Sequence, residues 1–110
     1  MKPSALFIIL ALSAIANLVT SPAYAQGNVC ASFLCMAGKT QGKNNVQGCI
    51  APVQAFFSPS LYIYDEEGID WPATALNRRQ WLSQCPGSQG GQNAAILNTI
   101  IAEYGMRASG

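Results

Sequence analysis

Residues 30–49 read CASFLCMAGKTQGKNNVQGC and contain three of the four cysteines of this 110-residue chain; the fourth is Cys85. An even number of cysteines in a short chain is typical of disulfides where the chain leaves the reducing cytosol. Zinc binding is a poor match, because the cysteines do not form two close pairs and the chain contains no histidine. The sequence therefore predicts two disulfides and no metal site.

The spacing of the cysteines bears on how they pair. Cys30 and Cys35 are five residues apart, so on a helix their side chains point roughly 140° away from each other. One loop joins Cys35 to Cys49, as in an antiparallel helical hairpin. We favour Cys35–Cys49 together with Cys30–Cys85. The alternative, Cys30–Cys49 with Cys35–Cys85, stays open, because sequence alone does not fix connectivity.

The segment before the first cysteine has the pattern of a secretory signal. Lys2 supplies a positive charge, residues 6–16 are almost entirely apolar, and residues 23–25 read AYA, the pattern of small residues that signal peptidase cleaves. The apolar run is shorter than the about 20 residues that span a bilayer. We therefore expect residues 1–25 to be a cleaved signal peptide and residues 26–110 to form one exported domain.

The expected exported domain is electrically neutral and small. Its charges are Lys39, Lys43, Arg78, Arg79 and Arg107 against Asp65, Glu66, Glu67, Asp70 and Glu103. A neutral domain has no long-range field to attract nucleic acid, so we expect no nucleic-acid partner. A domain of this size buries only about 60% of its unfolded surface, which is why it needs disulfides for stability.

Apolar residues recur at helical spacing in four segments, although the third segment follows that spacing imperfectly. Gly38 is expected to end the first of them, and Asp70, followed by Trp71 and Pro72, has the pattern of a helix start. The predicted helices cover residues 29–37, 49–57, 70–84 and 93–104. Residues 61–64 read LYIY, which favours a short extended segment. The predicted fold is a mainly all-α, four-helix, disulfide-stapled domain with one short extended segment.

The chain offers little catalytic chemistry. It lacks histidine, and its cysteines are expected to be bonded to one another. Asp65, Glu66, Glu67 and Asp70 form the one group that invites a mechanism, because paired carboxylates cleave glycosidic bonds. Their position around Gly68 is more typical of a solvated turn. We expect a non-enzyme without cofactors, with a cell-wall hydrolase as a minor alternative.

Large aromatic side chains are numerous for so short a domain. Aromatic residues are common energetic anchors of protein interfaces. Tyr62 and Tyr64 are two residues apart, so an extended chain places both on one face. The residues that we predict to bind a partner protein are Tyr62, Tyr64, Phe57 and Trp71.

One combination of residues resembles the TrbM/KikA family, which consists of small exported proteins encoded in the transfer regions of conjugative plasmids. The resemblance spans Cys30 to Pro86. It consists of Cys30 to Gly38, a glycine-rich loop, Gly48-Cys49, Phe56-Phe57-Ser58, Thr74, Arg78 and Trp81 to Pro86. Many family members continue well past the Cys-Pro pair, whereas here one predicted helix follows it.

The resemblance implies a periplasmic accessory protein of conjugal transfer and type IV secretion in a Gram-negative bacterium. Its expected partners are protein components of that apparatus, and the family supplies no catalytic residues. The alternative is a secreted effector, exclusion or killing factor that acts on the cell envelope. For that alternative, the apolar final helix over residues 93–104 would make peripheral contact with a membrane.

Overall fold

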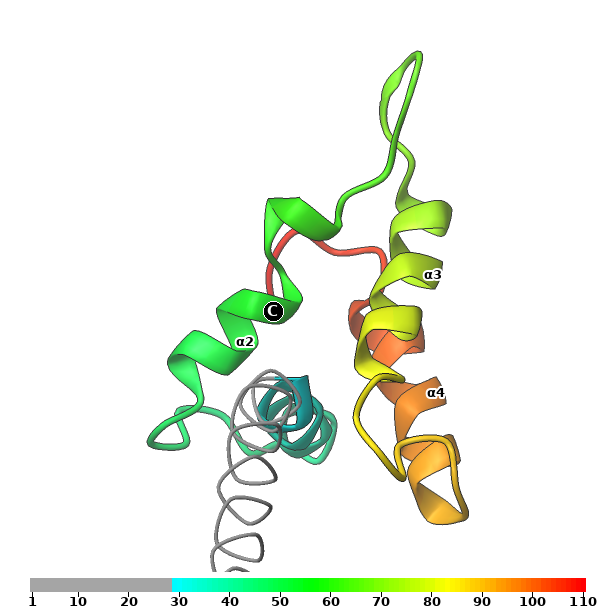
Figure 1. Cartoon of the computed structure of the whole chain (residues 1–110). Coiled ribbons are helices and arrows are strands. Elements are labelled where there is room, and N and C mark those ends of the chain that lie inside the picture. Colours follow the sequence, from blue (N-terminus) through cyan, green and yellow to red (C-terminus); the bar gives the residue numbers. More distant parts are fainter. Residues whose placement is uncertain (1–28) are drawn as a thin grey trace, which may run out of the picture.

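The computed structural model describes residues 29–110, so the predicted signal peptide lies outside the described residues. The described part is mainly α-helical, with four α-helices and a small hairpin, which confirms the predicted fold class (Figure 1). The helices are a first helix over residues 29–40, α2 (Ile50–Phe56), α3 (Trp71–Leu82) and α4 (Gln92–Tyr104). A short 3-10 helix, η1 (Pro59–Leu61), follows α2.

The first helix continues past Gly38, where the sequence led us to expect its end. The chain leaves the helix only after Thr40, whose hydroxyl donates to the Ala37 carbonyl at 2.6 Å. The Lys43 amide then donates to the Gly38 carbonyl at 2.9 Å. Gly42, with φ of 82°, supplies the left-handed turn that was expected of Gly38.

Helix α2 packs through its C-terminal end. Phe56 and Phe57 are buried, whereas Ile50 is 73% exposed. The predicted apolar face of this segment therefore exists, but only its last turn reaches the core. The first turn follows the exposed loop over residues 41–48 and points to solvent.

The short extended segment predicted over residues 61–64 forms only in part, because Leu61 ends η1 and Tyr64 begins the first strand of a hairpin. Strand β1 (Tyr64–Asp65) pairs antiparallel with β2 (Gly68–Ile69), with Tyr64 opposite Ile69. The turn between the strands is stabilised by the Glu67 amide, which donates to Asp65 Oδ1 at 2.8 Å. Figure 1 shows this hairpin projecting beyond the helices.

Side chains of α3 fix the base of the hairpin. Asp70 caps α3 as predicted, because its Oδ1 accepts from the Ala73 amide at 3.0 Å. The buried Thr74 hydroxyl accepts from the Ile63 amide at 2.9 Å. The bond between Thr74 and Ile63 couples the start of α3 to the chain that enters β1.

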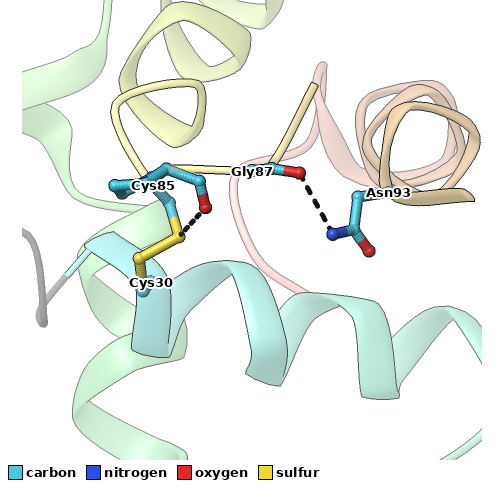
Figure 2. The surroundings of a disulfide bond; sticks show 5 residues. Cys30, Cys85, Gly87 and Asn93 are labelled. Carbon is cyan, nitrogen blue, oxygen red and sulfur yellow. Dashed lines mark hydrogen bonds between the residues drawn. A yellow bond between two sulfur atoms is a disulfide. The ribbon is translucent and has the colours of Figure 1, made fainter. Parts of the chain in front are cut away.

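The two disulfides join Cys30 to Cys85 and Cys35 to Cys49, which is the pairing favoured from the sequence. The first bridge holds the start of the first helix to the turn after α3 (Figure 2). From the start of α4, Asn93 Nδ2 donates to the Gly87 carbonyl in this turn at 3.1 Å. The disulfide and this hydrogen bond together fix the connection between α3 and α4.

A single apolar core joins the helices. Its members are Phe33, Met36, Ala37, Phe56, Phe57, Leu82, Leu97 and Ile100. The first helix, α2, α3 and α4 all contribute to it, so none of these short helices buries its apolar face alone. Over residues 29–110, no helix has the length and apolar character needed to cross a bilayer.

Candidate protein-binding surface

Three of the four predicted partner-binding residues gather at the base of the hairpin. The ring of Tyr62 lies 6.3 Å from that of Tyr64 and 5.4 Å from that of Trp71, measured between centroids, and both pairs are edge-to-face. Tyr62 and Trp71 are half-buried, while Tyr64 is 63% exposed. We call Tyr62, Tyr64 and Trp71 the aromatic cluster.

Phe57, the fourth predicted residue, lies in the core and does not join this surface. It is 9% exposed, and its ring packs edge-to-face on Phe56 at 4.9 Å and on Tyr104 at 6.2 Å. Phe57 lies inside because α2 ends at Phe56 and its last turn faces the core. Phe57 is therefore a core residue, and the candidate surface contains only Tyr62, Tyr64 and Trp71.

Arg78 separates Phe57 from the aromatic cluster. Its side chain is fully buried. The guanidinium carbon lies 5.1 Å from the ring centroids of both Phe56 and Phe57. It also lies 5.8 Å from the Tyr62 centroid and 5.7 Å from the Trp71 centroid. These distances are within the range of cation–π attraction, so one buried cation holds the core rings and the surface rings together.

Arg78 also binds the end of α4 and the chain that follows it. Its Nη1 donates to the carbonyls of Tyr104 at 3.0 Å, Gly105 at 2.8 Å and Arg107 at 2.7 Å. Carbonyls at a helix C-terminus carry partial negative charge, so they favour a cation. In the described part of the chain, Arg78 Nε and Nη2 have no hydrogen-bond partner. Aromatic rings surround the guanidinium, and N–H groups make weak hydrogen bonds to such rings.

Two opposing effects act on the protonation of Arg78. Burial lowers the pKa of its guanidinium, and the nearby Tyr62 acts in the opposite direction. The ordinary pKa of an arginine guanidinium is so high that the group stays protonated in proteins. Arg78 is therefore a permanent cation beneath the aromatic cluster.

Arg78 was not among the residues predicted to form a site, although the sequence contains a signal for its burial. Trp71, Thr74, Arg78 and Leu82 are three or four residues apart and share one face of α3. Thr74, Arg78 and Leu82 are all fully buried. A charged residue on the same helix face as buried residues indicates a buried cation that is bound by groups inside the protein. The neighbouring Arg79, which is only half-buried, obscures that signal.

The acidic residues form a solvent-facing turn. Asp65, Glu66 and Glu67 are exposed at the hairpin, while Asp70 caps α3. Two of these carboxylates accept backbone amides, as side chains of turns and caps do. Within residues 29–110, no three histidine, cysteine or acidic side chains come together in a way that would hold a metal ion.

The apolar stripe of α4 faces the core of the domain. Leu97 and Ile100 are buried, and Ile101 and Tyr104 pack against the core. The exposed positions of this helix include Asn98, Thr99 and Glu103. The apolar side chains that were expected to contact a membrane therefore pack against the core of the domain.

No protein-family model, curated protein or solved structure matches this chain. The resemblance to the TrbM/KikA family therefore stays a prediction that rests on the residue pattern.

Proposed function

We propose that this protein is a periplasmic accessory component of plasmid conjugal transfer, in a type IV secretion apparatus, and that it acts by binding other protein components. The observation that carries the binding role is the aromatic cluster, which is exposed at Tyr64 and fixed from below by Arg78. The resemblance to the TrbM/KikA family supports the assignment to conjugal transfer.

The residues that carry the resemblance stabilise the structure of this chain. The four cysteines form its two disulfides, Phe56 and Arg78 meet in the core, and Thr74 binds the base of the hairpin. A relative with these residues would retain the same disulfides and internal contacts. Partner recognition would then depend on the surface residues that these disulfides and contacts hold in place.

Both disulfides favour a location outside the reducing cytosol. The predicted signal peptide and the resemblance narrow this location to the periplasm. In that compartment, a rigid surface binds with little loss of conformational freedom, because its side chains are ordered before the partner arrives. Tyr64 packs edge-to-face on Tyr62, whose ring lies over the buried Arg78.

The proposal is tested by site-specific crosslinking in mating cells. A photo-crosslinking amino acid replaces Tyr64 in one strain and Leu76 in a control strain; Leu76 is exposed on α3 and does not belong to the aromatic cluster. We expect position 64, and not position 76, to crosslink to subunits of the transfer channel. The substitution Tyr64→Ser should weaken that contact about thirtyfold if Tyr64 is an interface hot spot.

Transfer frequency gives a second measurement. Deleting the gene should reduce plasmid transfer, and the wild-type gene and Leu76→Ser should both restore it, whereas Tyr64→Ser should not. Equal periplasmic amounts of the two variants exclude a folding defect as the cause. Normal transfer in the deletion strain, together with no crosslink to a channel subunit, would contradict the proposal.

A further inference from the structure

An apolar groove lies beside the Cys35–Cys49 disulfide. It is an open depression of about 220 Å³, and its lining includes Val46, Ile50 and Val53 together with the disulfide itself. Ile50 is 73% exposed, and Leu34, which precedes Cys35 in the sequence, is 69% exposed. We call this depression and its rim the disulfide groove. Its volume is below the about 300–1,000 Å³ typical of small-molecule sites, so it is better suited to one or two side chains.

The rim of the disulfide groove is basic. Lys39 and Lys43 both line it. Lys39 Nζ donates to the neutral Asn44 side chain at 3.1 Å and lies 5.7 Å from the Tyr104 ring centroid. Lys43 is exposed in the loop over residues 41–48. The groove therefore combines apolar walls with two positive charges, which fits an acidic segment that carries apolar side chains.

The hairpin of this same chain has that chemistry. Its turn carries Asp65, Glu66 and Glu67, all exposed, so three of the five acidic residues lie within one turn. Ile63 and Tyr64, directly before the turn, are 38% and 63% exposed. Figure 1 shows the hairpin at the top and the loop over residues 41–48 at the lower left, at opposite ends of the domain. A single copy therefore does not bring its own hairpin to its own groove.

We propose that the acidic hairpin of a second copy of this chain docks in the disulfide groove. The acidic turn would face Lys39 and Lys43, and Ile63 or Tyr64 would cover the apolar wall. Complementary charges of this kind guide association and fix its orientation. Because the domain has no net charge, overall repulsion does not oppose the approach of a second copy.

The two surfaces differ from each other, so the association is head-to-tail. Each added copy leaves a free hairpin at one end and a free groove at the other, which allows rings or chains of copies. A hairpin tip buries less than the about 800 Å² per partner of a standard stable interface. We therefore expect weak association that rises with protein concentration and falls with salt.

The test uses the exported protein purified from the periplasm with both disulfides formed. Sedimentation equilibrium covers concentrations from about 10 µM to about 1 mM, the range of weak affinities. The groove variant is Lys39→Gln/Lys43→Gln, and the hairpin variant is Asp65→Asn/Glu66→Gln/Glu67→Gln. The matched control is Arg79→Gln/Glu103→Gln, which neutralises one charge of each sign outside both surfaces. Circular dichroism verifies that every variant is folded.

We expect the average mass of the wild type and of the control to rise with concentration, and more so at low salt. Each surface variant alone should associate about tenfold more weakly. Mixing the two variants should restore binding, because one retains an intact hairpin and the other an intact groove. That complex should stop at two copies, since its remaining hairpin and groove are both altered.

Backbone amide spectra recorded during dilution locate the contact. Shifts are expected for residues 34–53 and 63–69 together. A monomeric wild type at the highest concentration would overturn the proposal. Association that persists unchanged in both surface variants would overturn it as well, and so would a mixture of the two variants that remains monomeric.

Discussion

At the scale of single residues, Arg78 contacts several separate parts of the domain. It lies between core rings and surface rings, and it donates to three carbonyls at and after the end of α4. Hydrogen bonds from a charged donor are stronger than neutral ones. One side chain thus connects the core, the candidate binding surface and the C-terminal segment.

Arg78→Met should lower the free energy of unfolding by about 2–4 kcal/mol, because one buried and two partly buried carbonyls lose their charged donor. Methionine retains most of the side-chain volume, so the effect reports the lost bonds more than a cavity. Urea denaturation with the disulfides intact measures it. Arg79→Met is the control and should change the free energy by less than about 0.5 kcal/mol. Equal effects of the two substitutions would show that burial of Arg78 contributes nothing.

At the scale of elements, local patterns predicted the helices well. The face formed by Leu97, Ile100, Ile101 and Tyr104 marked α4, and the cap at Asp70 marked the start of α3. These features depend on residues a few positions apart, which is why sequence alone reveals them. The first helix was predicted too short, because Gly38 can be accommodated in a helix and the turn forms at Gly42 instead.

Features that depend on distant residues were harder to predict. The hairpin pairs Tyr64 with Ile69 across two-residue strands, which are too short to show a periodic pattern. In the candidate surface, the proximity of Tyr62 and Tyr64 follows from their spacing in the sequence. The approach of Trp71 to these two residues depends instead on the hairpin turn that separates Tyr64 from Trp71. The burial of Phe57 depends on where α2 meets Tyr104, and no local pattern reports that contact.

At the scale of the whole molecule, the two disulfides hold together helices that are individually too short to be stable. The sequence separations are 55 residues for Cys30–Cys85 and 14 residues for Cys35–Cys49. Chain entropy alone assigns them about 4 and about 3 kcal/mol of stabilisation. A domain of this length has a total stability of roughly 4–13 kcal/mol. The bridges therefore account for a large part of it.

Reduction of both disulfides should abolish the cooperative thermal transition or shift it far below that of the oxidised protein, because the unfolded chain regains the lost entropy. Far-UV circular dichroism with and without a phosphine reductant measures the change. A cooperative transition at the same temperature after reduction would show that the bridges are dispensable.

The pairing of the cysteines in the exported protein is the most direct test of the fold. Pepsin at acidic pH cleaves next to Phe33 and Leu34, between Cys30 and Cys35, and low pH suppresses disulfide exchange by keeping thiols protonated. Mass spectrometry of the unreduced peptides should then find Cys30 linked to Cys85 and Cys35 linked to Cys49. A link between Cys30 and Cys49, or four thiols that alkylate without denaturant, would contradict the structure described above.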